Sequence, residues 1–299
     1  MKRLLALLLL CVLLCSAALA ESALEAPFVP DSAGAAVAAA AADALGLSLR
    51  LTEEADPGAA ADAMLASPGL LLCADQAVLI AGLQGYTSAD LRTAMRPVCR
   101  IASCPLYLAA DAAMAEEMGF SDAEGLLALI AENEYELTFA RHISADVIDR
   151  AVTKLADGIA VLTEYYLEDE IADVLASGEA QAAVITGDRL AADDGSLLPL
   201  CSLGAERTAD RPDLPCAAEL GIPVCDGVLV WILASADTPD ETVQKAADTC
   251  LAIAPESFGA APGYVFAPLS GEDAAEEIAR VFADYKEYMT SEGLFFYEE

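Results

Sequence analysis

The chain alternates short apolar runs with longer stretches in which apolar residues recur every three or four positions. A short apolar run between polar or turn residues is typical of a buried strand, and the wider spacing is typical of an amphipathic helix. We therefore expect strands at residues 70–73, 98–102, 106–108, 137–140, 182–185, 198–201, 228–234 and 264–267.

Helix start signals stand between these runs. Residues 121–124 and 238–241 carry the Ser/Thr-x-x-Glu capping pattern, and the second has proline at the first helical position. The alanine-rich stretch 35–44 favours one helix packed closely on a sheet, because alanine is the best helix former. Strands that alternate with helices predict an α/β fold with largely parallel sheets.

The first twenty residues have the pattern of a secretory signal. Lys2 and Arg3 precede an apolar run at 4–14, and Ala18 and Ala20 provide the small residues that a signal peptidase accepts. The run is shorter than the roughly 20 residues of a membrane-spanning helix, although an uncleaved anchor is the alternative. We expect an exported protein, periplasmic or on the outer face of the cell membrane.

The charge of the chain is strongly negative. Loss of Lys2 and Arg3 with the signal leaves 13 cationic side chains against 49 acidic ones, a net charge of −36. Binding to nucleic acid or to an anionic membrane needs clustered cations, so neither is an expected partner. The acids either solubilise the surface or attract a cationic ligand or partner.

Seven cysteines remain after the signal, and none forms a Cys-x-x-Cys pair. This excludes a zinc ribbon and a thioredoxin-like redox site, and we expect no metal or cofactor. Export permits disulfides, but an odd number leaves at least one thiol free or paired between chains. Most of the cysteines stand in apolar runs, where cysteine behaves as a small buried hydrophobe.

The sequence lacks the common enzyme motifs. It has no Gly-x-Ser-x-Gly elbow, phosphate-binding Gly-x-x-x-x-Gly-Lys loop, Gly-x-Gly-x-x-Gly turn or His-Glu-x-x-His pair. Acidic residues are too numerous for any pair of them to indicate acid–base catalysis. We therefore expect a protein that is not an enzyme.

The stretch from Gly204 to Gly221 is the most informative motif. It holds two arginines, two prolines and then Glu-Leu-Gly, and Thr238-Pro239 follows the next apolar strand. In this order the motif resembles a signature of the substrate-binding proteins of tripartite tricarboxylate transporters, the TctC/Bug family of extracytoplasmic solute receptors. Shorter stretches at 27–30, 96–105, 137–140 and 175–179 resemble further pieces of the family pattern.

The resemblance implies a two-lobed periplasmic-binding-protein fold of type II, in which each lobe is a mostly parallel sheet flanked by helices. After a signal at 1–20, we expect one lobe from residues 21–110 and 236–299 and the other from 111–235. The chain would cross between them near 104–122 and 225–238, with a solute cleft at the crossing.

The implied function is capture of a small solute, a carboxylate or an amino acid, for the permease subunits of a tripartite transporter. The alternative is a sensor or interaction protein on the same scaffold, with a diverged or lost ligand site. Ligands of such folds bind beyond the carboxyl ends of strands, where helix N-termini favour an anion. The resemblance therefore places the cleft at the loops 29–34, 141–144 and 164–168, with Trp231 near one wall.

The chain departs from the family pattern at all three loops. Asp31 and Ser32 stand where a glycine pair is expected, Arg141 and His142 replace serine and glycine, and only Tyr165 matches the third loop. Asp31 is a candidate to cap the following helix instead. The expected ligand-binding residues are Asp31, Ser32, Gly34, Arg141, His142, Tyr165 and Trp231.

Arg141 is the candidate to hold a ligand carboxylate through a bidentate contact, the alternative being an ion pair with one of the many acids. His142 is the only histidine. No second ligand or nucleophile motif accompanies it, so we do not expect a metal-binding or general-base role.

Overall fold

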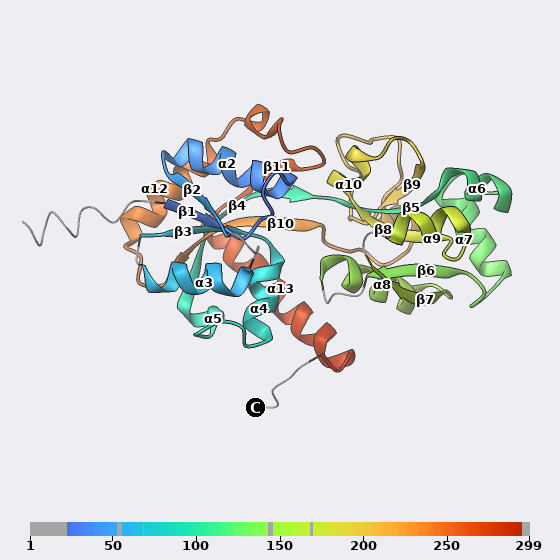
Figure 1. Cartoon of the computed structure of the whole chain (residues 1–299), viewed down its shortest axis with the longest axis horizontal. Coiled ribbons are helices and arrows are strands. Elements are labelled where there is room, and N and C mark those ends of the chain that lie inside the picture. The colour runs from blue at the N-terminus through green and yellow to red at the C-terminus, as the bar shows by residue number, and fades with distance from the viewer. Residues whose placement is uncertain (1–22, 53–55, 68, 143–145, 168–169, 295–299) are drawn as a thin grey trace, which may run out of the picture.

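The computed structural model describes residues 23–52, 56–67, 69–142, 146–167 and 170–294. They form two α/β lobes that lie side by side along the long axis of the molecule (Figure 1). Each lobe has one sheet with helices on both faces, which confirms the expected fold class. No helix among these residues is long and apolar enough to cross a bilayer.

The first lobe contains a six-stranded sheet. From one edge to the other, its strands are β11 (Val265–Leu269), β4 (Met95–Cys104), β10 (Val228–Ser235), β3 (Leu71–Ala74), β1 (Ala23–Ala26) and β2 (Ser48–Leu51). Strand β1 pairs in parallel with β2 and β3, whereas β10 is antiparallel to both β3 and β4, and β11 is antiparallel to β4. The sheet is mixed, and not mostly parallel as expected, because β4 leaves for the second lobe and β10 returns beside it.

The two faces of this sheet build separate cores. On β10, Leu229, Trp231 and Leu233 point into the core on one face of the sheet, and the residues between them point into the core on the other face. This alternation is the two-residue period of a strand. One face is covered by α3 (Pro57–Ala66), α4 (Gln76–Leu83) and α13 (Gly271–Ser291), and the other by α2 (Ala33–Leu45) and α12 (Asp240–Leu251). The short helices α5 (Leu91–Ala94) and η2 (Pro255–Phe258) complete the lobe.

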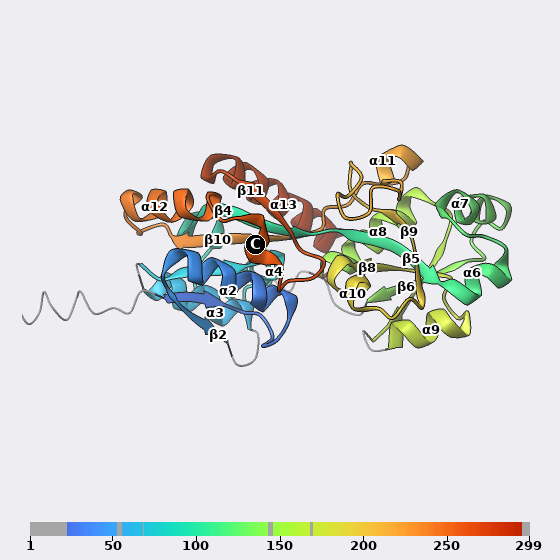
Figure 2. The same cartoon turned by 90° about the horizontal axis from the view of Figure 1, so that it is seen from above.

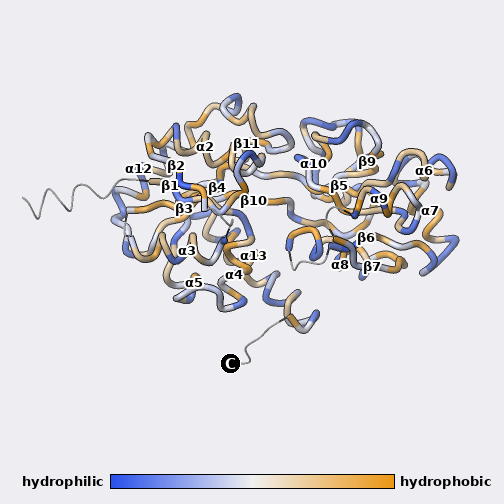
Figure 3. Tube along the Cα trace, viewed as in Figure 1, coloured by the Kyte–Doolittle hydropathy of each residue, from blue (hydrophilic) through white to orange (hydrophobic). Residues whose placement is uncertain are grey.

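The second lobe contains a five-stranded sheet in the order β7-β6-β8-β5-β9. The strands span Leu162–Tyr166, Thr138–His142, Ala182–Thr186, Leu106–Asp111 and Leu197–Ser202. Pairs β7–β6 and β6–β8 are parallel, and β8–β5 and β5–β9 are antiparallel. The helices are α6 (Ala112–Met118), α7 (Ala123–Glu132), α8 (Val147–Gly158), α9 (Ile171–Ser177), α10 (Gly187–Ala192) and α11 (Ala217–Leu220). Hydrophobic residues are prominent along the central strands of both lobes (Figure 3).

The chain crosses between the sheets at two points. Strand β4 ends at Cys104 and β5 begins at Leu106, so the outward crossing is at Pro105. The return runs through Gly227 into β10. Sheet membership therefore places β5 in the second lobe and β10 in the first, which differs from the expected division after residues 110 and 235. The apolar runs of β4 and β5 are separated by one proline, and sequence pattern alone does not reveal that they belong to different sheets.

All eight predicted strands are present, and the described residues contain three more. The additional ones, β1, β2 and β7, are short, and β2 and β7 are edge strands with partly exposed side chains. An edge strand buries little apolar surface, so its sequence does not show a continuous apolar run.

Candidate functional site

The carboxyl ends of the parallel strands meet between the lobes. Strand β3 is followed by Asp75 and Gln76 of the first lobe, and β6 leads toward Asp146 and Val147 of the second. Gln76 and Val147 line one narrow gap. At the end of β8, Gly187 lies so close to the first lobe that an added Cβ would be 2.9 Å from the Gly263 carbonyl oxygen. This is the position at which open α/β folds bind ligands.

A cavity of 220 Å³ opens at the ends of β6 and β8. Its wall is mostly aliphatic, and its polar groups stand together; the lining residues are Ala140, His142, Ile148, Ile171, Val184, Ile185, Thr186, Asp188 and Arg189. An apolar wall with a few placed polar groups is typical of a small-molecule site. Drug-sized ligands need about 300 Å³ or more, so this cavity fits a small solute.

His142 is the predicted site residue that lines this cavity. Its Nδ1 lies 2.9 Å from Oδ2 of Asp146. Asp146 is the N-cap of α8, and its other oxygen accepts the Asp149 N–H at 2.9 Å. The strand alternation puts Ala140 and His142 on the cavity face, and Arg141 on the opposite face of β6.

The helix N-termini around the cleft are already capped by side chains. Ser32 accepts from the Ala35 N–H of α2 at 3.1 Å, and Asp75 accepts from Ala77 of α4 at 2.9 Å. Together with Asp146, these caps use N–H groups that would otherwise be offered to an anionic ligand. The capping groups at α4 and α8 are carboxylates, so they also bring negative charge to the cleft.

The acidic groups of the two lobes influence one another. Burial raises the pKa of Asp75, and the negative charge of Asp146 raises it further. Burial likewise raises the pKa of Tyr264, with contributions from Cys104, Asp75 and Asp188. Asp188 also accepts a hydrogen bond from the Cys104 thiol at 3.6 Å. The cleft is therefore electronegative, and Arg189 is a cationic group on its cavity wall.

Arg141 takes part in a buried polar network on the other side of β6. Its guanidinium donates to Asp149 of α8 and, at 2.6 Å, to Glu292 beyond the end of α13. Tyr288 of α13 donates to the same Asp149 carboxylate. The predicted contact of Arg141 with a ligand carboxylate does not fit this placement, because the charge is neutralised within the protein and faces away from the cavity. The alternative, an ion pair with an acid, describes the arrangement.

Tyr165 and Trp231 also lie away from the cavity. Tyr165 is on edge strand β7, 53% exposed, with its ring 4.7 Å from the Arg141 guanidinium carbon. Trp231 is fully buried beneath α13, where its indole N–H donates to Glu277 at 2.9 Å. Trp231 occupies the centre of the sheet because β10 is a middle strand of the first lobe. The sequence had predicted Trp231 near one wall of the cleft, and its fully buried position does not fit that prediction.

The first predicted loop leads into α2. Ser32, and not Asp31, caps this helix, and Asp31 is exposed with a φ of 65°. Gly34 lies in the first turn, where an added Cβ would be 2.7 Å from a Phe28 ring carbon. Glycine at this position leaves the space that the Phe28 ring occupies. The predicted positions 143, 144 and 168 lie outside the described residues.

The motif at 204–221 builds a loop on the second lobe. Arg207 Nε donates to both carboxylate oxygens of Glu219 at 3.0 and 2.9 Å, and its Nη1 donates to the Pro212 carbonyl at 2.9 Å. Glu219 in turn accepts the Cys216 N–H at 3.1 Å. The motif therefore has a structural role in closing this loop.

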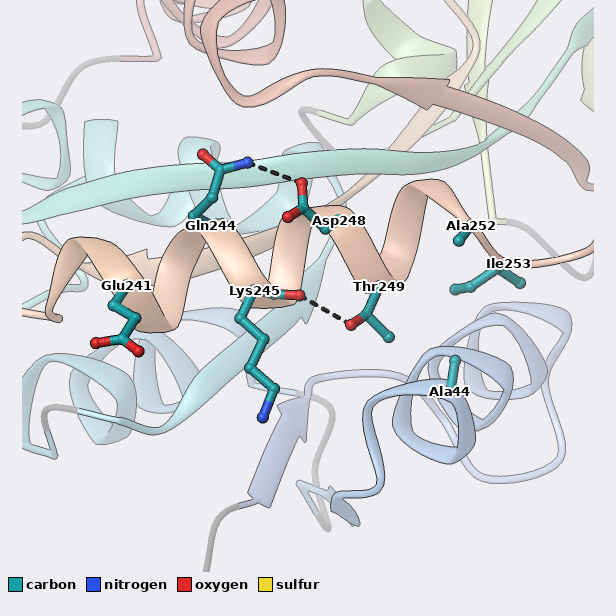
Figure 4. A pocket seen from close by; sticks show the side chains of 8 residues that line it. All are labelled: Ala44, Glu241, Gln244, Lys245, Asp248, Thr249, Ala252 and Ile253. Carbon is teal, nitrogen blue, oxygen red and sulfur yellow. Dashed lines mark hydrogen bonds between the residues drawn. The ribbon is translucent and has the colours of Figure 1, made fainter.

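A larger open groove of 790 Å³ runs along α12 beside α2 on the outside of the first lobe (Figure 4). Its polar side chains bond within α12: Gln244 donates to Asp248 at 2.8 Å, and Thr249 donates to the Lys245 carbonyl at 2.8 Å. No polar groups converge in it from separate strands. The smaller cavity at the strand ends of the second lobe is therefore the better candidate site.

Neither a metal centre nor a disulfide is found in the described part of the chain. No group of three or more His, Cys, Asp or Glu side chains there could hold a metal ion. The seven cysteines are free thiols, and all are buried. Burial raises the pKa of Cys201 to about 12 and of Cys225 to about 11, so these thiols stay protonated at neutral pH. The prediction that the cysteines act as small buried hydrophobes is confirmed.

No family model matches this sequence, and no curated protein matches it either. Solved structures do match the fold of this chain. A TctC solute-binding protein from Polaromonas aligns with a TM-score of 0.71 at 17% identity, over 90% of this chain and 97% of its own. An adipate-bound protein of R. palustris aligns at 0.66 and 17%, over 92% and 98%. MatC from Rhodopseudomonas palustris, with bound malate, aligns at 0.64 and 14%, over 90% and 99%.

These alignments define the class of fold. The chain has the two-lobed fold of the TctC and Bug periplasmic solute-binding proteins over about nine-tenths of its length. The resemblance seen in the sequence is therefore confirmed at the level of the fold.

The sequence interpretation missed several cleft residues. Asp75 directly follows the predicted strand 70–73, and Thr186, Asp188 and Arg189 follow the predicted strand 182–185. The rule that sites lie beyond the carboxyl ends of strands would have selected them. The family resemblance places the cleft at three other loops, so these positions are not among the predicted ones.

Proposed function

We propose that this protein is an extracytoplasmic receptor that captures a small solute for a tripartite tricarboxylate-type secondary transporter. The observation that carries the proposal is the 220 Å³ cavity at the strand ends of the second lobe, with His142, Asp188 and Arg189 on an apolar wall, in a chain that has the solute-receptor fold. A carboxylate on the solute is supported by Arg189 at the cavity and by the adipate and malate bound to the two neighbours.

Binding would act through the relative position of the lobes. A solute that contacts both lobes favours the closed arrangement over the open one by its extra contacts there. The two crossings at Pro105 and Gly227 are the places where the chain can bend. The closed form would then dock on the membrane permease subunits, and export would depend on the leader at residues 1–20, which lies outside the described residues.

The experiment is a ligand screen on the mature chain from Glu21. Thermal unfolding is measured with mono-, di- and tricarboxylates, amino acids and amines, because a ligand that binds only the folded state raises Tm. Calorimetry and small-angle scattering then test affinity and lobe closure for each hit. We expect at least one hit with a more compact scattering profile. A screen without any hit would contradict the receptor proposal.

A sensor or interaction protein on the same scaffold is the second candidate. It is favoured by the capped helix N-termini and by the use of Arg141 within the protein. A stable complex with a partner in the absence of any solute would support this second candidate over transport.

A further inference from the structure

The 220 Å³ cavity at the ends of β6 and β8 differs between its inner and outer parts. Four apolar lining residues, each at most 8% exposed, form its inner wall: Ala140, Ile171, Val184 and Ile185. The polar lining residues are partly exposed and form its rim: His142, Thr186, Asp188 and Arg189. A solute in this cavity therefore meets polar groups at one end and aliphatic side chains at the other.

The order of residues along the two strands explains this division. On β6, Ala140 is followed two positions later by His142, and on β8 Val184 is followed two positions later by Thr186. Because β6 and β8 are parallel neighbours, both strands reach their polar residue at the same edge of the sheet. A strand rises by about 3.3 Å per residue, so the rim lies roughly 6–7 Å from the inner wall.

Arg189 is the cationic group of the rim. A guanidinium carries five N–H donors in a planar fork, so it can contact a ligand carboxylate as well as groups of the chain. The acids nearby are directed to other partners: Asp188 accepts a hydrogen bond from the Cys104 thiol at 3.6 Å, and Asp146 contacts His142 at 2.9 Å. The charged contact that the rim offers through Arg189 therefore suits an anionic group.

The size of the cavity limits the length of the solute. A cavity of about 150 Å³ with aliphatic and aromatic walls holds benzene, which has six carbon atoms. By this proportion, the 220 Å³ cavity holds about nine non-hydrogen atoms. A straight monocarboxylate of about seven carbons has that number of atoms.

A second carboxylate on the solute does not fit this arrangement. At the inner wall it would be buried against the side chains of Val184 and Ile185, which donate no hydrogen bond, and burial of an unpaired charge is strongly unfavourable. If the second carboxylate stayed in solvent, the carbon chain would remain outside the cavity and lose its apolar contacts. In either position, a dicarboxylate binds more weakly than the monocarboxylate of the same length.

We propose that this cavity takes an aliphatic monocarboxylate of up to about seven carbons, with its carboxylate at Arg189 and its chain against the inner wall. The proposal rests on the receptor function above and narrows the solute to one with a single charged end. It distinguishes this chain from the structural neighbours that hold adipate or malate, because those solutes carry two carboxylates.

The test is calorimetry on the mature wild-type protein with two sets of solutes. The straight-chain series from propanoate to nonanoate varies only in length. We expect affinity to rise about fourfold per carbon, the equivalent of burying one methylene, up to about heptanoate, and to rise no further beyond it. The second set keeps six carbons and changes the charged ends. Hexanoate should bind at least about tenfold more tightly than adipate or hexan-1-amine.

Two variants test the two ends of the cavity separately. Ala140→Val adds two carbon atoms to the inner wall, so affinity should stop rising at a chain about two carbons shorter, a shift that lower stability alone does not produce. Arg189→Gln should weaken hexanoate about tenfold or more, because a charged hydrogen bond is replaced by a neutral one. The matched controls are Ala267→Val on β11 and Arg92→Gln on α5. Both lie outside the cavity, so they should keep the length limit and change affinity less than about twofold.

The outcomes separate this inference from the receptor function. The inference is overturned if adipate or hexan-1-amine binds as tightly as hexanoate, if affinity keeps rising through nonanoate, or if the wider screen finds ligands but no monocarboxylate; the receptor function stands in each case. If nothing in these two sets or in the wider screen binds, the receptor function itself fails. Should a variant not fold, the two wild-type series decide.

Discussion

Arg150 on α8 and Asp284 on α13 form an ion pair at 2.6 Å that joins the two lobes. Helix α13 packs on β4 of the first lobe and extends toward the second, where Arg141 and Tyr288 add further contacts (Figure 2). One apolar cluster also continues from the first lobe into the second on this side. The lobes are thus held together behind the cleft, and any closing motion has to keep or break these contacts.

The first prediction tests that connection. Asp284→Asn should lower the free energy of unfolding by about 1–3 kcal/mol, because the buried residue Arg150, 3% exposed, loses its charged partner. The cost is moderated because Asp284 is partly exposed. Urea unfolding measures it, with Glu287→Gln on the exposed side of α13 as the control. Equal losses in both variants would show that the ion pair adds no stability.

The second prediction concerns Arg141. Arg141→Ala should destabilise the protein by about 3–5 kcal/mol, because Asp149 is left as a buried carboxylate without its cation. Affinity for a solute found in the screen should stay within about twofold of wild type, since the guanidinium faces away from the cavity. The double variant Arg141→Ala/Asp149→Ala should recover part of the stability. A large loss of affinity with unchanged stability would return Arg141 to the binding site.

The third prediction concerns the only tryptophan. Trp231→Phe should cost about 1–3 kcal/mol, because Glu277 loses the indole donor in a buried position. Arg100 still donates to this carboxylate, which limits the loss. Wild-type fluorescence should be blue-shifted, as expected of a buried indole, and should change little on solute binding. A strong spectral response to solute would place Trp231 near the cleft after all.

The fourth prediction follows from the raised pKa of Asp75. A carboxyl whose pKa is higher in the folded state than in the unfolded state reduces stability at pH values above both, and the penalty disappears as the pH falls below the unfolded pKa. Asp75→Asn should therefore raise Tm relative to wild type at pH 7, and the difference should shrink toward pH 4. Melting curves of both proteins across this range provide the measurement. A lower Tm for the variant at pH 7 would contradict the prediction.

The fifth prediction concerns the return crossing. At Gly227 an added Cβ would overlap the Cys104 carbonyl oxygen of the outward crossing. Gly227→Ala should push the two crossings apart and cost about 1–3 kcal/mol, the range of an overpacked site. It should also weaken solute binding through altered lobe geometry. Gly204→Ala is the control, because its Cβ would have no neighbour closer than 3.5 Å; a similar loss there would remove the argument from close approach.

The sequence alone determined the class of fold and the buried strands. Buried strands such as β3, β8 and β10 show continuous apolar runs because both of their faces are covered, so their positions were predictable. The motif around Arg207 and Glu219 also indicated the fold, because the loop that it closes is held by contacts between residues near in sequence.

Tertiary structure decided which sheet each strand joins and which way each polar side chain points. Arg141 and His142 are adjacent in sequence, yet one lies in a buried ion network and the other lines the cavity, because successive strand residues face opposite sides of the sheet. The partners of Arg141 are Asp149 of α8 in the second lobe and Glu292, just after α13 of the first lobe. Local pattern carries no information on such distant contacts, so the charge of the cleft could be recognised only once the lobes were placed together.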